Sequence, residues 1–192
     1  MKRRKKSSQT GRTGLLGVLS LLGSLLLLLN WGGVLKPRKK TITISRDAGN
    51  IYRLLLSEGI SDEYAKYMTA QSAHETANFT SVLYQDYFNA FGMTYVGQSE
   101  AKTGVILPGG KVIYASYKDW SYSVKDYKRL WKSYGLVLFA NVEQFVRLLK
   151  QKDYFTAPEK EYREAVKNWL DFYFPGGKLL PELEIPGAGG TW

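Results

Sequence analysis

The chain has 192 residues, which is long enough for one domain of about 150 residues with a substantial core and short flanking segments. Its formal charge of +10 comes from residues 1–40, which hold ten Lys or Arg and no acid, whereas residues 41–192 hold 17 basic and 17 acidic side chains. The basic composition is therefore a property of the N-terminal region, and it gives no evidence for a nucleic-acid-binding surface.

The N-terminal region divides into a basic tail, residues 1–13, an uncharged Leu-rich stretch, residues 14–35, and a basic linker, residues 36–45. The Leu-rich stretch is long enough to cross a bilayer core of about 30 Å. No small-x-small cleavage site follows it, which favours an uncleaved transmembrane anchor over a signal peptide. Six positive charges precede it and four follow it, which predicts an N-terminus inside and a domain on the wall side.

Residues 46–174 are expected to form the folded domain, beginning with a helix over about residues 47–57. Ser61 is a good N-cap for a second helix, which places Glu75 near the C-terminal end of that helix. The partial negative charge of this end and the apolar setting both raise the pKa of a carboxyl group. A raised pKa is what a general acid working near neutral pH requires. The competing interpretation is a solvated Glu at a helix end.

The residues around Glu75 disfavour other chemistries. His74 is the only histidine, the chain has no cysteine, and the second histidine of a helical zinc-protease motif, due at Asn78, is missing. Metal ligation and a Ser-His or Cys-His nucleophile are therefore both poorly supported. We expect carboxylate chemistry without a metal or cofactor.

Several short motifs around Glu75 together resemble glycoside hydrolase family 73. They are Ala70-Gln71, His74-Glu75-Thr76, Ser81 and Asn89-Ala90-Phe91-Gly92-Met93, with Thr76 and Ala90 replacing the family's Ser and Leu. The resemblance implies a lysozyme-like, mainly α (α+β) fold and an endo-β-N-acetylglucosaminidase that cleaves peptidoglycan. It implies that Glu75 is the general acid and that Asn89 contributes to substrate binding. The His-Glu-Thr triplet also resembles the chitinase-like branch of the lysozyme superfamily. Both resemblances imply that Glu75 is the acid, but they imply cleavage of different bonds.

Residues 93–117 are expected to form a small β-lobe, with β-rich segments at Met93–Val96 and Lys111–Tyr117 and a glycine-rich connection between them. Glu100 is the only carboxylate in this lobe. The resemblance implies that a second acid here activates water or stabilises positive charge on the sugar, and Glu100 is our candidate for it. Asp119, at the exit of the lobe, is the other option, and an exposed loop residue is the alternative for Glu100.

The segment from Tyr114 to Tyr127 is similar to a second motif run of the family, with Asp119 replacing a Ser. Ser121 or Ser123 is predicted to cap a helix, and most of its aromatic residues are expected in the core. Tyr117 and Trp120 precede that helix and are predicted to stack on sugar rings.

Two further helices are predicted in the C-terminal third, one capped by Asn141 and one carrying Tyr162 on its inward face. Tyr154, Thr156 and Tyr162 approximately match a third family run. The resemblance implies that Tyr162 lies in the cleft near the acid, although simple packing would explain it equally. Residues 175–192 are rich in Pro and Gly and are expected to form a loose tail.

These inferences predict a membrane-anchored hydrolase of the β-1,4 bond after N-acetylglucosamine, with peptidoglycan glycan strands and a lipid bilayer as partners. The arrangement suits a bacterial envelope protein or a phage whose virion contains a membrane. One alternative is a lytic transglycosylase on the same fold. The other is an inactive, membrane-tethered wall-binding protein.

Overall fold

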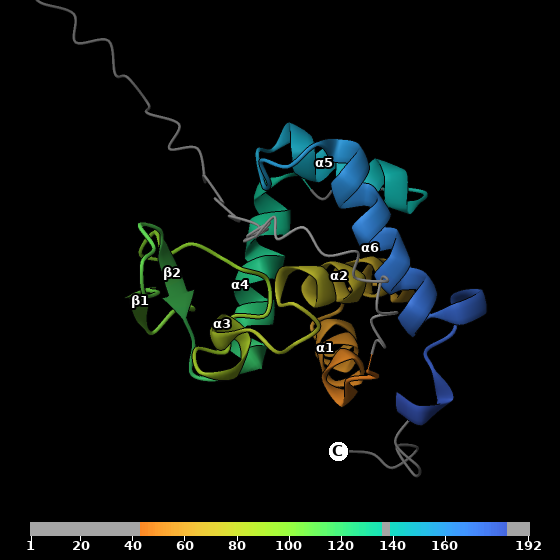
Figure 1. The fold of residues 1–192 in the computed structure, drawn as a ribbon, viewed down its shortest axis with the longest axis horizontal. Coiled ribbons are helices and arrows are strands. Elements are labelled where there is room, and N and C mark those ends of the chain that lie inside the picture. Colours follow the sequence, from red (N-terminus) through yellow and green to blue (C-terminus); the bar gives the residue numbers. More distant parts are fainter. Residues whose placement is uncertain (1–42, 136–138, 184–192) are drawn as a thin grey trace, which may run out of the picture.

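A computed structural model describes residues 43–135 and 139–183 of the chain. This part is mainly helical with one two-stranded sheet, which confirms the mainly α (α+β) content of the predicted fold class (Figure 1). The elements are α1 (Arg46–Ser57), α2 (Asp62–Glu75), α3 (Val82–Gln85), β1 (Thr103–Ile106), β2 (Ile113–Ser116), α4 (Trp120–Ser133), α5 (Val142–Gln151), α6 (Glu159–Tyr173), η1 (Pro175–Gly177) and η2 (Pro181–Leu183).

The predicted anchor, residues 14–35, lies outside the described residues, as do the basic tail and most of the linker. Across residues 43–135 and 139–183, no helix combines the length and the apolar character needed to span a bilayer.

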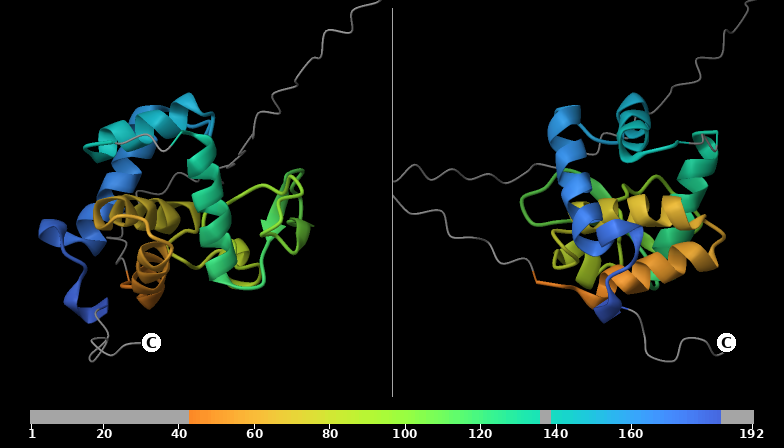
Figure 2. Two further views of the ribbon diagram at one scale, coloured as in Figure 1. Left: turned by 180° about the vertical axis from the view of Figure 1, so that it is seen from behind. Right: turned by 90° about the vertical axis from the view of Figure 1, so that its right-hand side faces the viewer.

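Helix α2 runs through the middle of the helical part and packs against α1 and α6 (Figures 1 and 2). Small residues on several of its sides, Ala65, Ala70 and Ala73, are fully buried, so neighbouring helices approach it closely. The first residues of α2 are exposed, but from Met68 onward nearly every residue is buried, so the C-terminal half of the helix ends in the interior of the molecule. Its last residue, Glu75, is therefore carried into the core.

The predicted helices are present, and side-chain caps explain where α4 and α5 begin, whereas Ser61 stands at the N-cap of α2 without a side-chain hydrogen bond. Asn141 accepts a hydrogen bond from the Gln144 amide at 3.0 Å, as predicted for α5. The cap of α4 was predicted wrongly at Ser121 or Ser123. Asp119 takes that place, because its extended backbone directs its carboxylate to the Ser121 amide at 2.9 Å and starts the helix at Trp120.

The β-lobe lies at one end of the molecule, beyond α4 (Figure 1). Its antiparallel strands pair Thr103 with Ser116 and Ile106 with Ile113. The predicted strand at Met93–Val96 is wrong, since only Thr94 forms a bridge, to Tyr114 on β2. Strand β1 was missed because Gly104 interrupts its pattern of side chains. A Cβ atom on Gly104 would lie 2.5 Å from Ile113 and 2.7 Å from Tyr95, so the glycine is needed for packing.

The C-terminal segment was predicted as a loose tail, and for residues 175–183 this is wrong. Leu183 is 4 % exposed, and its carbonyl oxygen accepts a hydrogen bond from Arg53 on α1 at 3.0 Å. The apolar Leu183 side chain packs where Gly49 of α1 leaves room. The folded domain therefore extends to residue 183, and residues 184–192 lie outside the described part.

Candidate active site

Glu75 is the last residue of α2, and its side chain is 7 % exposed. Oε1 accepts a hydrogen bond from the Tyr162 hydroxyl at 2.5 Å, whereas Oε2 is buried and has no partner among the described residues. Burial raises the pKa of Glu75 to about 8, and the hydrogen bond from Tyr162 opposes this only in part. The carboxyl group is therefore largely protonated at neutral pH.

Tyr162 reaches Glu75 because α6 packs along α2. Its ring is stacked on Phe155 with centroids 3.7 Å apart, and it meets the edge of the His74 ring at 4.9 Å. Burial lowers the pKa of His74, which keeps this imidazole neutral near pH 7. Two aromatic contacts thus fix the direction of the Tyr162 hydroxyl.

The backbone that follows Glu75 is strained. Ala77, Asn78 and Phe79 have φ angles of 50°, 60° and 63°, in the left-handed region that costs a non-glycine residue roughly 1–2 kcal/mol. The Thr76 hydroxyl accepts a hydrogen bond from the Phe79 amide, and the Asn78 side chain donates one to the carbonyl oxygen of Thr43. Strain of this kind, held by specific bonds, is typical of functional sites.

A tight turn, residues 89–93, brings Gly92 against the acid. A Cβ atom on Gly92 would lie 3.5 Å from Glu75 Oε2, and its φ of +63° favours glycine. Asn89 holds this turn, donating to the carbonyl oxygens of Met93 and Ala115 and accepting from the Met93 amide. Asn89 is fully buried, so its predicted contact with substrate is wrong and its role here is structural.

The two predicted stacking residues differ in their surroundings. Tyr117 is 2 % exposed and its hydroxyl donates to Asp126 at 2.6 Å, so its ring is not available to a glycan and that prediction is wrong. Trp120 is half-buried, is stacked on Tyr84 with centroids 5.1 Å apart, and donates its ring N–H to the Tyr84 carbonyl oxygen. Tyr117 was misassigned because sequence does not reveal which way an aromatic ring turns at the end of a strand.

Glu100 lies on the loop before β1 and forms an ion pair with Arg129 of α4 at 3.3 Å. Arg129 also binds the fully buried Asp126, which accepts further hydrogen bonds from Gln98 and Tyr117. This network joins the β-lobe to α4. Among the described residues, no hydrogen bond or ion pair connects Glu100 to Glu75.

Gly92 belongs to the site and Tyr114 on β2 is a candidate for it, and neither was singled out from sequence. Burial and, to a smaller extent, the charge of Glu75 raise the pKa of Tyr114, whose side chain is half-buried. The position of Tyr114 at the start of the second motif run could have indicated it from sequence. The place of Gly92 in the Asn-Ala-Phe-Gly-Met run could likewise have indicated that residue.

Within residues 43–135 and 139–183, no group of three or more His, Cys, Asp or Glu side chains is arranged to hold a metal ion.

Comparison with known proteins gives one family match. A family model described as mannosyl-glycoprotein endo-beta-N-acetylglucosaminidase matches residues 57–173, which run from the end of α1 to the end of α6. A search of curated protein sequences finds no significant match. Among solved structures, a type VI secretion system effector-immunity complex from Pseudomonas protegens is similar at 14 % identity, with a TM-score of 0.44, over 66 % of this chain and 99 % of that chain.

Proposed function

Because the chain belongs to the glucosaminidase family and is therefore a glycosidase, we propose that it hydrolyses the β-1,4 bond after N-acetylglucosamine in peptidoglycan, with Glu75 as the general acid. The observation that carries the assignment is the state of the Glu75 carboxyl group. It is buried, its pKa is raised to about 8, and one of its oxygens has no partner among the described residues.

The two oxygens of Glu75 have separate tasks in this proposal. Oε1 accepts the Tyr162 hydrogen bond and orients the carboxyl group, which leaves the proton on Oε2. That proton passes to the glycosidic oxygen as the bond to the sugar carbon breaks, and positive charge develops on the sugar ring. Tyr162 then stabilises the carboxylate that forms, because a hydrogen bond to a charged acceptor is stronger than one to a neutral acceptor.

Glu100 remains our proposed second carboxylate, which would activate water or stabilise the charge on the sugar. Its support is that it is the only acid in the β-lobe and that its side chain is 21 % exposed. Trp120 remains a proposed contact for the glycan, and half-buried Tyr114 on β2 joins it, because burial and the charge of Glu75 both raise the pKa of its hydroxyl. Tyr162 is 2 % exposed and stacked on Phe155, so its ring, like that of Tyr117, is not available to a glycan, and its proposed role is to orient Glu75.

We also propose that residues 14–35 anchor the enzyme in a membrane, with the domain on the wall side. The support is the uncharged Leu-rich composition of that stretch and its basic flanks. A cell envelope or the membrane of a lipid-containing phage virion would both suit such an enzyme.

The decisive experiment incubates the full-length chain with purified peptidoglycan and identifies the products by mass spectrometry. Wild type is compared with Glu75→Gln, and Glu164→Gln serves as the matched control because that Glu is exposed on α6. We expect new reducing N-acetylglucosamine ends from wild type and from the control, and a loss of about 10²- to 10⁴-fold in the Glu75 variant.

Each other outcome assigns a different function. Anhydro-muramyl ends would identify a lytic transglycosylase. Near-zero turnover by all three folded proteins would leave an inactive wall-binding protein.

A further inference from the structure

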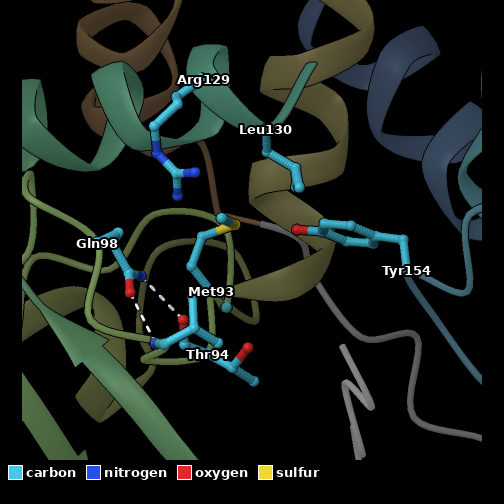
Figure 3. A pocket seen from close by; sticks show the side chains of 8 residues that line it. Met93, Thr94, Gln98, Arg129, Leu130 and Tyr154 are labelled. Carbon is cyan, nitrogen blue, oxygen red and sulfur yellow. Dashed lines mark hydrogen bonds between the residues drawn. The ribbon is translucent and has the colours of Figure 1, made fainter. Parts of the chain in front are cut away.

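A pocket of about 160 Å³ lies beside the proposed acid, between α4 and residues 92–98 (Figure 3). It is lined by Gly92, Met93, Thr94, Val96, Gln98, Arg129, Leu130 and Tyr154. Gly92 links the two places, because it lines the pocket and also lies against Glu75 Oε2. The pocket has room for about five water-sized volumes, so it can take a small substituent of a substrate bound at Glu75.

Most of the lining is apolar or already hydrogen-bonded. In Figure 3, Met93 and Leu130 point toward the hydroxyl end of the Tyr154 side chain. The Tyr154 hydroxyl donates to the Phe91 carbonyl oxygen at 2.5 Å. The Gln98 amide donates to Asp126 and to the Thr94 carbonyl oxygen and accepts from the Val96 amide, so it has little left to offer a ligand.

Two polar groups at the pocket remain available. Arg129 directs its guanidinium from α4 into the pocket, and its Nη1 donates no hydrogen bond to any residue of the described part (Figure 3). The hydroxyl of half-buried Thr94 likewise makes no hydrogen bond within residues 43–135 and 139–183.

The charge of Arg129 is already compensated. It pairs with Asp126 at the buried side and with Glu100 at the exposed side. A carboxylate ligand would add a third negative charge to this cluster and would be repelled. A neutral ligand with a carbonyl acceptor would gain a charge-assisted hydrogen bond without that repulsion.

We propose that this pocket is an acetamido subsite, which receives the N-acetyl group of a sugar next to the bond that Glu75 protonates. The methyl group would lie against Met93, Leu130 and the Tyr154 ring. The carbonyl oxygen would accept from Arg129 Nη1, and the amide N–H would donate to the Thr94 hydroxyl. The inference rests on the proposed function, since it takes the substrate to be an N-acetylated glycan.

The test measures binding rather than turnover, with the full-length chain carrying Glu75→Gln. The probes are chitotetraose, which carries acetamido groups, and cellotetraose, which has the same β-1,4 linkage and a hydroxyl group in place of each one. Thr94→Val removes the hydroxyl group, and Thr103→Val is its control on the exposed edge of the same lobe. Leu130→Phe fills the pocket, and Leu56→Phe is its control at an exposed position of α1.

We expect Thr94→Val to weaken chitotetraose binding by about three- to tenfold, the effect of one lost hydrogen bond. Leu130→Phe should weaken it more, because the added ring occupies the space of the methyl group. Binding of cellotetraose should be weak and unchanged by either variant, and both controls should bind like the parent protein.

The subsite and the proposed function fail in different ways. Three results would overturn the acetamido subsite even if wild type cleaves peptidoglycan. They are an equal loss of affinity for both oligosaccharides in the variants, no loss of affinity for either, and no measurable binding of chitotetraose by the Glu75→Gln parent. A selective loss of chitotetraose binding would support the subsite even if wild type released no products, in which case only the catalytic proposal would fall.

Discussion

The hydroxyl of Tyr162 donates a hydrogen bond of 2.5 Å to Oε1 of Glu75, whereas Oε2 has no partner among the described residues. The two residues are 87 positions apart in the chain and lie on different helices, so the contact depends on the packing of α6 along α2. It makes the carboxyl group asymmetric, with one oxygen held and the other free to carry a proton. This asymmetry leads to the first prediction.

Tyr162→Phe is predicted to move the alkaline limb of the pH profile of kcat/KM to higher pH. The Tyr162 hydrogen bond stabilises the carboxylate and so lowers the pKa of Glu75, although burial still raises that pKa to about 8. Removing the bond raises the pKa further. A general acid is active while protonated, so kcat/KM falls as pH rises through this pKa, and the fall should begin at higher pH in the variant. The maximal rate should drop about tenfold or more because orientation is lost.

The control is Tyr52→Phe, which also removes a hydrogen bond between a tyrosine and a carboxylate, here Asp62, at the surface. Its pH profile should match that of wild type. A limb that stays in place or moves to lower pH in Tyr162→Phe would contradict the assignment of Glu75 as the titrating acid.

Glu75→Gln is predicted to make the protein more stable, increasingly so as pH rises. The pKa of Glu75 is raised from 4.5 to about 8 by burial, so between these values the native state holds a proton that the unfolded state has released. The free energy of unfolding of wild type therefore falls as pH rises through this range. Gln does not ionise, so the variant escapes this loss.

The melting temperature, measured at intervals from pH 5 to pH 8, checks this. The difference between Glu75→Gln and wild type should be smallest near pH 5 and largest near pH 8. Glu164→Gln, at an exposed position, should show no such trend. A constant difference would mean that the Glu75 pKa is not raised.

Gly92→Ala is predicted to reduce activity far more than stability. The new methyl group would lie 3.5 Å from Glu75 Oε2 and would cover the oxygen that delivers the proton. The left-handed backbone, with φ of +63°, adds a strain of roughly 1–2 kcal/mol. Gly59→Ala carries comparable strain at φ of +77° with no atom within 4 Å, so it separates strain from contact with the acid. Equal losses of kcat in the two variants would contradict this role for Gly92.

The sequence was sufficient for most helices and for the position of Glu75. Apolar spacing and N-caps such as Asn141 are local signals, and α1, α2, α5 and α6 depend on them. Strand β1 could not be found in this way, because Gly104 has no side chain to contribute to a strand pattern. A glycine is required at this position because Tyr95 and Ile113, from other parts of the lobe, pack directly against it.

The site was less predictable, because its contacts join distant segments. A polar residue in a motif, such as Asn89, is as well suited to holding a buried turn as to binding a sugar, and only the fold distinguishes them. The contact of Tyr162 with Glu75 was suggested by resemblance to a family, not by periodicity. The ion pair of Arg129 with Glu100 had no local signal at all.

Glu100→Gln is predicted to lower kcat by about 10²-fold or more while leaving the fold intact, if Glu100 is the second carboxylate. Asp119→Asn tests the other acid considered for this role. Asp119 caps α4 through the Ser121 amide, and Asn is an equally good cap, so that variant should keep both stability and activity. Kinetics and melting temperatures of both variants decide the matter. The opposite ranking of kcat would transfer the role to Asp119.

Leu183→Ala is predicted to destabilise the domain by about 2–4 kcal/mol, because it empties a buried position beyond the last long helix. Leu183 is 4 % exposed and its segment is tied to α1 by the hydrogen bond from Arg53. Leu56→Ala, at a position 36 % exposed on the same α1, should cost much less. Chemical denaturation of the two variants provides the comparison. Equal midpoints would mean that residues 175–183 form a loose tail after all, as their Pro- and Gly-rich sequence first indicated.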